Sequence, residues 1–170
     1  MTEPEMTPRS SGPAVVIRQA GEADVAEILA MIGELASFEH MSDDVVCTPE
    51  GLHDALFGPD GFVRVSLATL RQGDGDDPAS YHPIAGMALW FPTFSTFLGR
   101  PGIWLEDLFV RPAHRRLGVA RALLSDLRRR TSGRVEWDVL EWNRGAIDLY
   151  RSVGARPVEG WTRFRWSDPA

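Results

Sequence analysis

The chain has 170 residues, of which 44% are hydrophobic and 25% charged, so it suits a single globular domain with its own core. Its net charge of −6 argues against general nucleic-acid binding, and no run of apolar residues is long enough to span a membrane. The one cysteine, Cys47, excludes an internal disulfide framework and fits a reducing compartment, so the sequence predicts a cytoplasmic protein.

The first residues, 1–13, are polar and proline-rich, which predicts a disordered leader ahead of one domain over residues 14–170. Residues 14–18 are a short β-branched run and predict a strand. A helix is expected next, closing at His40. Its apolar side chains recur at helical spacing and predict one buried face: Val25, Ile28, Leu29, Ile32 and Leu35.

A second, shorter helix is expected to begin at Thr48, which is a good N-cap and is followed by proline, and to end near Phe57. Residues 62–70 and 84–91 then predict two paired strands. The polar, acidic segment between them, residues 72–83, predicts a loop in which mobility is expected.

Residues 92–102, which include Phe94 and Phe97, are predicted as a further loop. It leads into an apolar strand at residues 103–110. The following segment, residues 115–120, reads Arg-Arg-Leu-Gly-Val-Ala and opens a helix with one apolar face.

This turn has the character of an anion site. The small residues Gly118 and Ala120 permit a close approach of ligand to backbone. A helix start carries unpaired N–H groups and a partial positive charge, to which Arg115, Arg116 and Arg121 add formal charge. A diphosphate fits such a turn, although an ordinary arginine-rich helix start explains these six residues equally well.

Two common phosphate loops are excluded. All 18 basic residues are arginine, so the lysine of a Walker-type loop has no counterpart, and the Rossmann G-x-G-x-x-G pattern is missing as well.

Residues 134–141 predict a second buried strand. Asn143 is placed to cap a helix that ends at Gly154. A last strand is predicted at residues 160–166, with residues 155–158 as a short neighbour. Strand pairs interleaved with helices predict a mixed sheet covered by helices.

The turn at residues 115–120 resembles the Arg/Gln-x-x-Gly-x-Gly/Ala loop of the GNAT superfamily of N-acetyltransferases. Four segments resemble, more narrowly, the spermidine/spermine (diamine) acetyltransferase branch, which includes the thialysine N-epsilon-acetyltransferases. They are residues 16–18 with 28–39, residues 104–110, residues 141–143 with 148–150, and residues 160–161. Arg116 stands where the polyamine enzymes often have glycine.

The resemblance implies an α/β (α+β mixed) fold with a central, twisted, mostly antiparallel sheet of six to seven strands and about four helices. It implies that the sheet splays between the parallel strands at residues 103–110 and 134–141, and that acetyl-CoA binds in the opening. It also implies a homodimer, a small-molecule amine as substrate and no metal.

The resemblance further assigns roles to residues around this opening. The implied cosubstrate-binding residues are Leu108, Phe109, Val110, Arg115, Arg116, Leu117, Gly118, Val119, Ala120, Arg121, Asn143, Arg144, Gly145 and Ala146. Tyr150 is implied as the general acid near the thiol, and Glu106 as the carboxylate that meets the amine. The candidates for substrate contact are Phe38, Glu39, Glu106, Asp107 and Asp138.

The chemistry requires a base, because an alkyl amine with a pKa of roughly 10.4 is almost entirely protonated at neutral pH. Carboxylates are the available candidates. Glu106 lies in an apolar strand, and strand alternation predicts that Asp107 lies on the opposite face, with Leu105 and Phe109. The structural alternatives are a paired acid for Glu106 or Asp107, a core position for Tyr150, a helix cap for Asn143 and a solvated helix end for Glu39.

The sequence therefore predicts an acetyl-CoA-dependent N-acetyltransferase that acts on a small di- or polyamine or a thialysine-like amino acid by direct attack in a ternary complex. Two alternatives stay open. One is a related enzyme for another amine, such as an amino acid, a drug amine or a protein N-terminus. The other is a non-catalytic acyl-CoA-binding sensor.

Overall fold

The structure, a computed structural model, describes residues 12–71 and 82–167. Most of the expected leader and most of the expected loop at residues 72–83 lie outside these described residues. The chain divides into two compact units, Met1–Asp138, which contains the whole sheet, and Val139–Ala170, which contains the last helix.

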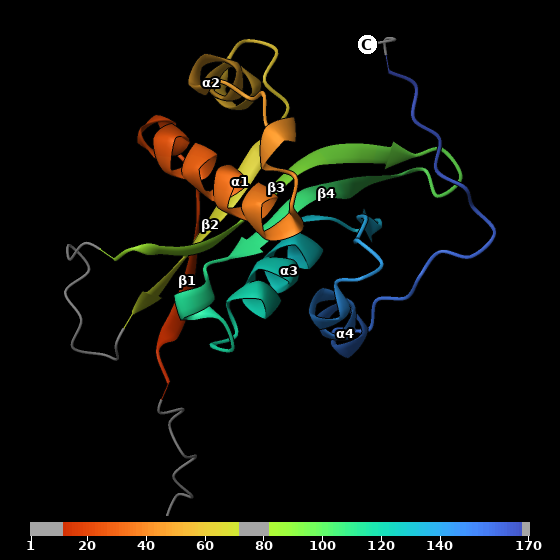
Figure 1. The fold of residues 1–170 in the computed structure, drawn as a ribbon. Coiled ribbons are helices and arrows are strands. Elements are labelled where there is room, and N and C mark those ends of the chain that lie inside the picture. Colours follow the sequence, from red (N-terminus) through yellow and green to blue (C-terminus); the bar gives the residue numbers. More distant parts are fainter. Residues whose placement is uncertain (1–11, 72–81, 168–170) are drawn as a thin grey trace, which may run out of the picture. The chain divides into compact units, whose positions relative to one another are not determined.

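The sheet has five strands in the order β1-β2-β3-β4-β5 (Figure 1). The strands are β1 (Ala14–Gln19), β2 (Arg64–Arg71), β3 (Ile84–Ser95), β4 (Arg100–Val110) and β5 (Val135–Glu136). The first four pair antiparallel, and β4 pairs parallel with β5. The prediction of a mixed, mostly antiparallel sheet that contains a parallel pair is confirmed, with five strands in place of the expected six to seven.

The missing strands are those predicted near the end of the chain. Among the described residues, neither 155–158 nor 160–166 forms a strand, and the strand expected at residues 134–141 is shortened to Val135–Glu136. A strand needs a hydrogen-bonded edge beside it, and these two segments have none among the described residues. The predictions for these segments are wrong in this structure.

The loop predicted at residues 92–102 is also wrong, because β3 and β4 continue there as a paired hairpin down to Ser95 and Arg100 (Figure 1). Pro92 had argued for a loop. However, β2 begins opposite Trp90, so beyond that point β3 is an edge strand, where a proline lacking its N–H is tolerated.

Four helices accompany the sheet: α1 (Val25–Glu39), α2 (Pro49–Phe57), α3 (Val119–Arg130) and α4 (Arg144–Ser152). Their predicted ends are confirmed. Thr48 Oγ1 accepts a hydrogen bond from the Gly51 N–H at 3.1 Å, and His40 closes α1 in a left-handed conformation with φ 62°. Among the described residues, no helix is both long and apolar enough to cross a membrane.

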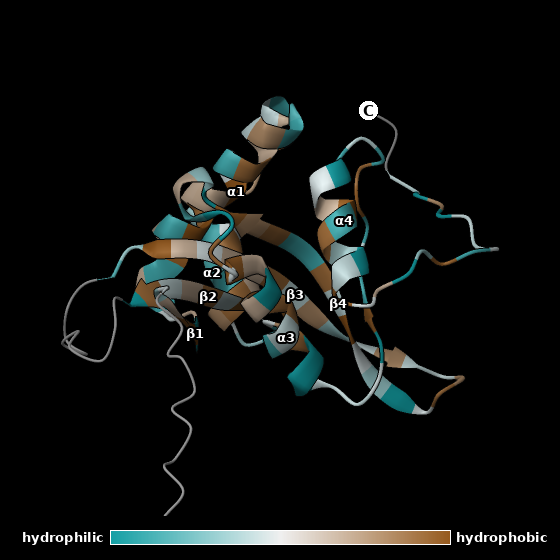
Figure 2. Ribbon diagram, turned by 90° about the horizontal axis from the view of Figure 1, so that it is seen from below, coloured by the Kyte–Doolittle hydropathy of each residue, from teal (hydrophilic) through white to brown (hydrophobic). Residues whose placement is uncertain are grey.

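The main core lies between the sheet and the first two helices. Side chains of the central strands, hydrophobic in Figure 2, pack there against the apolar faces of α1 and α2. The buried members are Val25, Ile28, Met31, Leu52, Leu56, Val65, Leu67, Ile84, Met87, Leu89 and Phe109. The predicted apolar stripe of α1 is therefore its buried face.

The opposite face of the sheet is fastened to α3 by a buried polar node around Ser66, whose side chain is fully buried. Its hydroxyl accepts hydrogen bonds from Gln19 Nε2 at 3.1 Å and Trp90 Nε1 at 3.3 Å, and donates to Asp126 Oδ2 at 3.1 Å. Asp126 also accepts from Arg130 Nε at 2.7 Å. Four elements thus share one satisfied network.

Replacing Ser66 by alanine tests this node. We expect Ser66→Ala to lower the free energy of unfolding by about 1–3 kcal/mol, because the donors of Gln19 and Trp90 lose their buried acceptor. Urea denaturation measures the change. The exposed Ser125→Ala on the same helix is the control and should change stability by less than about 0.5 kcal/mol. Equal effects of the two substitutions would contradict the node.

Candidate active site

A bulge in β4 sets the geometry of the site. In the pairing of β3 with β4, Leu89 faces Asp107 and the next residue, Trp90, faces Leu105, so Glu106 is an extra residue. Leu89 and Trp90 point to opposite faces of the sheet, and their partners follow them. Asp107 therefore lies on the α1 face with Phe109, while Leu105 lies on the other face. The prediction that Asp107 shares a face with Leu105 is wrong.

The parallel strands touch at one end and separate beyond it. Ile103 N–H donates to the Arg134 carbonyl at 2.8 Å, and a Cβ added to Gly133 would collide with the Pro101 carbonyl oxygen. Pairing then covers only Ile103 and Trp104. From residue 105 to residue 110, β4 has no strand partner on this side among the described residues. Apart from the Val110 carbonyl, which accepts a hydrogen bond from Arg115 Nε, the backbone groups of this segment that point away from β3 can meet a ligand there.

This open edge leads to the turn before α3. Arg116 and Gly118 both have left-handed backbones, with φ 66° and 82°. Gly118 is the N-cap of α3 and provides no side-chain cap. The first N–H groups of the helix are therefore not capped by a side chain, and they lie beside three arginines, Arg115, Arg116 and Arg121. The arrangement fits a diphosphate.

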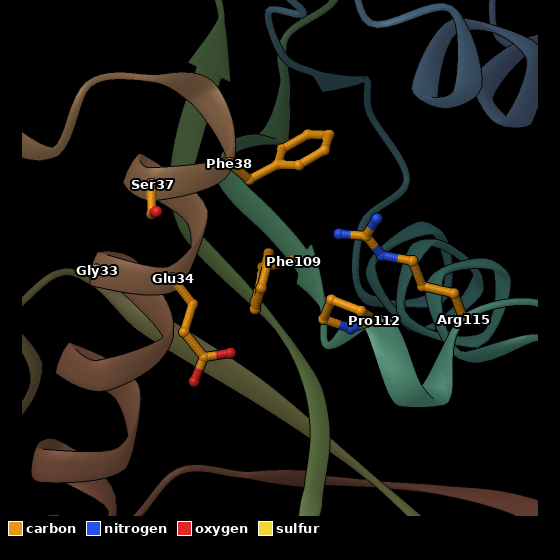
Figure 3. Close-up of a pocket in the computed structure, with 7 residues that line it drawn as sticks. All are labelled: Gly33, Glu34, Ser37, Phe38, Phe109, Pro112 and Arg115. Atoms are coloured by element: carbon orange, nitrogen blue, oxygen red, sulfur yellow. The ribbon is translucent and has the colours of Figure 1, made fainter.

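A pocket of about 550 Å³ lies between α1 and the segment that follows β4 (Figure 3). It is lined by Gly33, Glu34, Ser37, Phe38, Phe109, Pro112 and Arg115. Phe38 and Arg115 reach toward each other across it, with the guanidinium carbon 5.0 Å from the ring centroid. Arg115 Nε also donates to the Val110 carbonyl at 3.0 Å. The structure thus brings Phe38, Phe109 and Arg115 together around one pocket.

Two other carboxyl groups, those of Glu106 and Glu39, act on the carboxyl group of Asp107. Burial, together with the negative charges of Glu106 and Glu39, raises the pKa of Asp107 to about 6. Burial also raises the pKa of Glu39 at the end of α1. Glu106 is exposed, and its Oε2 accepts a hydrogen bond from Trp104 Nε1 at 2.7 Å. The predicted substrate-side acids Glu39, Glu106 and Asp107 therefore form one electrostatic group.

An ion-pair network that the sequence analysis missed braces the pocket. Arg111 follows β4 directly, and its guanidinium donates to Glu34 at 2.7 Å, to Glu27 at 2.6 Å and to the Ile84 carbonyl at 3.2 Å. It thereby joins α1 to the end of β4. The signal available in the sequence was the glutamate spacing of seven along α1, but its partner lies 77 residues away from Glu34.

Other predicted site residues lie on the C-terminal unit, apart from Asp138, which is exposed at the end of the first unit. Asn143 Oδ1 accepts from the Ala146 N–H at 3.2 Å, so the predicted helix cap is confirmed. Arg144 and Gly145 form the first turn of α4, and Tyr150 is half-buried on the same helix.

Comparison with known proteins gives a consistent result. The profile of the acetyltransferase (GNAT) family matches residues 58–155. Thialysine N-epsilon-acetyltransferase of Sus scrofa is 34% identical over 164 residues, covering 92% of this chain and 95% of that protein. L-ornithine N5-acetyltransferase NATA1 of Arabidopsis thaliana is 27% identical over 208 residues, covering 99% and 91%.

Among solved structures, a possible acetyltransferase from Clostridium difficile 630 is similar with a TM-score of 0.70 and 14% sequence identity. The match covers 92% of this chain and 99% of that one. At this identity the likeness shows the fold alone.

The left-handed backbone of Arg116 can be tested by substitution. We expect Arg116→Gly to raise the free energy of unfolding by about 0.5–1 kcal/mol, because glycine adopts φ 66° without the cost that a Cβ adds. Arg116→Ala removes the same charge but keeps the Cβ, so it should bring no such gain. Thermal or urea unfolding of the pair measures the difference, and equal stabilities would contradict backbone strain.

The raised pKa of Asp107 predicts how stability changes with pH. Between about pH 4 and pH 6 the folded protein holds a proton that the unfolded chain has lost, so the free energy of unfolding falls as pH rises. At pH 7, Asp107→Asn should therefore be more stable than the parent protein, by about 1–3 kcal/mol, and the gain should vanish near pH 4.

Urea denaturation at the two pH values measures this gain. The exposed Asp60→Asn is the control and should change stability by less than about 0.5 kcal/mol at either pH. A gain from Asp107→Asn that is independent of pH would contradict the shifted ionisation.

Proposed function

The chain belongs to the acetyltransferase (GNAT) family, and on that premise we propose that it transfers the acetyl group of acetyl-CoA to a primary amine of a small di- or polyamine or a thialysine-like amino acid. The family assignment makes the protein an acyltransferase. The choice of amine, the ternary-complex mechanism, the homodimeric state and the cytoplasmic location are the further parts of the proposal.

One observation carries the proposal: the unpaired edge of β4 runs directly to the uncapped start of α3. Acetyl-CoA, when bound, supplies an acyl thioester together with an amide-bearing arm and a diphosphate. The backbone of Leu108, Phe109 and Val110 would hold the arm, and residues 115–121 would hold the diphosphate. Asn143, Arg144, Gly145 and Ala146 are proposed to contact the cosubstrate from α4.

The acidic group of Glu39, Glu106 and Asp107 supports an amine substrate. Glu39 and Glu106 both repel the charge of Asp107, and a bound cation relieves that repulsion. Phe38 offers an aromatic wall beside them, and Asp138 is an additional acidic candidate. The relatives that act on thialysine and on L-ornithine, by their names, point to an amine at the end of a short chain.

The proposed chemistry divides between two side chains. Glu106 is the carboxylate that meets the positive charge of the amine, and Tyr150 donates a proton to the leaving thiolate. Alignment of the amine with the thioester contributes much of the remaining rate enhancement.

An acetyl-CoA consumption screen tests this function. The panel contains diamines, polyamines, thialysine, ornithine, other amino acids, drug amines and N-terminal peptides. Turnover that is highest for the diamines, polyamines or thialysine supports the proposal. Turnover only on drug amines or peptides would favour another enzyme of the family, and acetyl-CoA binding without turnover on any amine would favour a sensor.

Tyr150→Phe tests the acid. We expect the variant to lose at least tenfold in kcat, which is about 1.4 kcal/mol of transition-state stabilisation, while acetyl-CoA affinity changes little. Steady-state kinetics and calorimetry measure the two quantities. Tyr81→Phe, at the other tyrosine in the chain, is the control. Undiminished turnover in Tyr150→Phe would remove Tyr150 from this role.

A further inference from the structure

We infer that Asp107, and not Glu106, is the group that accepts the proton of the substrate amine. The inference rests on the proposed N-acetyltransferase function and deepens it, because it separates two roles that adjacent carboxylates share. Glu106 keeps the role of meeting the cation, and Asp107 becomes the general base.

The position of Asp107 follows from the bulge in β4. The extra residue at Glu106 turns Asp107 to the α1 face, in line with Leu89 of β3 and next to Phe109 on its own strand. Phe109 lines the pocket at the end of α1. Without the bulge, Asp107 would point to the α3 face with Leu105 and could not reach the pocket side of the sheet.

The Asp107 side chain is half-buried, and its carboxylate has no partner among the described residues. Within residues 12–71 and 82–167, no group donates a hydrogen bond to it and no arginine forms an ion pair with it. Buried carboxylates are usually satisfied by such partners. A base must have its oxygens available for the incoming proton, and Asp107 meets that condition.

Glu106 is engaged at one of its two oxygens. Its Oε2 already accepts the indole N–H of Trp104 at 2.7 Å, and its side chain is exposed to water. A solvated, hydrogen-bonded carboxylate is better suited to attract a cation than to remove its proton.

The charged groups that act on Asp107 come from two elements. Glu39 approaches from the end of α1 and Glu106 from β4, and both are negative. Leu89, its partner in β3, has no charge. On β5, Glu136 is paired with Arg134 at 3.2 Å, and Arg115 of the pocket is held by Phe38 and the Val110 carbonyl.

Burial and the two like charges raise the pKa of Asp107 to about 6, close to the ideal for a base at neutral pH.

The proton balance is simple. The ammonium group of the substrate gives one proton to the Asp107 carboxylate, which becomes a neutral acid. The free amine forms a C–N bond to the thioester carbon, the C–S bond breaks, and the second nitrogen proton leaves as the thiolate is protonated. Asp107 then releases its proton to water, so the net reaction yields amide, thiol and one proton.

Three matched variants test the assignment through the pH dependence of kcat/KM for the amine. For the parent protein we expect an acid limb near pH 6 and a plateau above it. Asp107→Asn should remove this limb and lower kcat/KM at neutral pH by at least a hundredfold, leaving a rate that rises with pH toward the pKa of the free amine.

Glu106→Gln and Glu39→Gln should keep the limb but move it to lower pH, because each removes a like charge. For Glu106→Gln, KM should rise more than kcat falls.

A second readout needs no turnover. With carboxyl-¹³C aspartate in the parent protein without ligand, one resonance should titrate near pH 6 and be missing in Asp107→Asn. Addition of thialysine alone should move its midpoint to lower pH, because a bound cation stabilises the carboxylate.

The outcomes separate the two proposals. If the parent protein acetylates an amine but the acid limb disappears in Glu106→Gln and persists in Asp107→Asn, the assignment of Asp107 is overturned and the function stands. If no resonance of Asp107 titrates near pH 6, the assignment also fails. If no amine is acetylated, the proposed function fails and the assignment fails with it.

Discussion

The extra residue that β4 accommodates opposite β3 is the constraint on which the site depends. Because of this extra residue, Leu105 and Asp107 lie on opposite faces of the sheet. Leu105 lies on the α3 face, while Asp107 and Phe109 lie on the α1 face. The same strand pairs with β5 only at Ile103 and Trp104, which leaves its following segment unpaired on one side among the described residues. One strand therefore supplies a core wall, a free backbone edge and two carboxylates.

This strand acts only if the layers around it are fixed. On one face, Arg111 joins the end of β4 to two glutamates of α1, so the pocket wall and the strand move together. On the other face, the buried hydroxyl of Ser66 links three strands or their ends to Asp126 of α3. Both networks are buried or partly buried and well hydrogen-bonded, and such networks hold their members in one arrangement. The helix start and the acidic group are thereby held on the same framework.

Much of this fold could be predicted from the sequence, because helical periodicity and caps are local signals. The stripe of α1, the cap at Thr48 and the cap at Asn143 are each determined by residues a few positions apart. The family resemblance, carried by short motifs, is confirmed by the sequence comparisons. What failed depended on partners elsewhere in the chain. The bulge requires knowledge of β3, the hairpin at Pro92 requires knowledge that β2 has ended, and the acidic group requires the end of α1 beside β4.

The positive charge of the turn before α3 comes from arginine side chains, because the chain contains arginine but no lysine. Guanidinium stays protonated and is not a nucleophile at neutral pH, so the positive charge of this turn is constant across the pH range in which Asp107 titrates. A change of pH near 6 therefore alters the charge of Asp107 but not the charge of the turn before α3. Because the chain has no lysine, it has no side-chain amine that acetyl-CoA could acetylate. The enzyme is therefore protected from acetylating its own side chains.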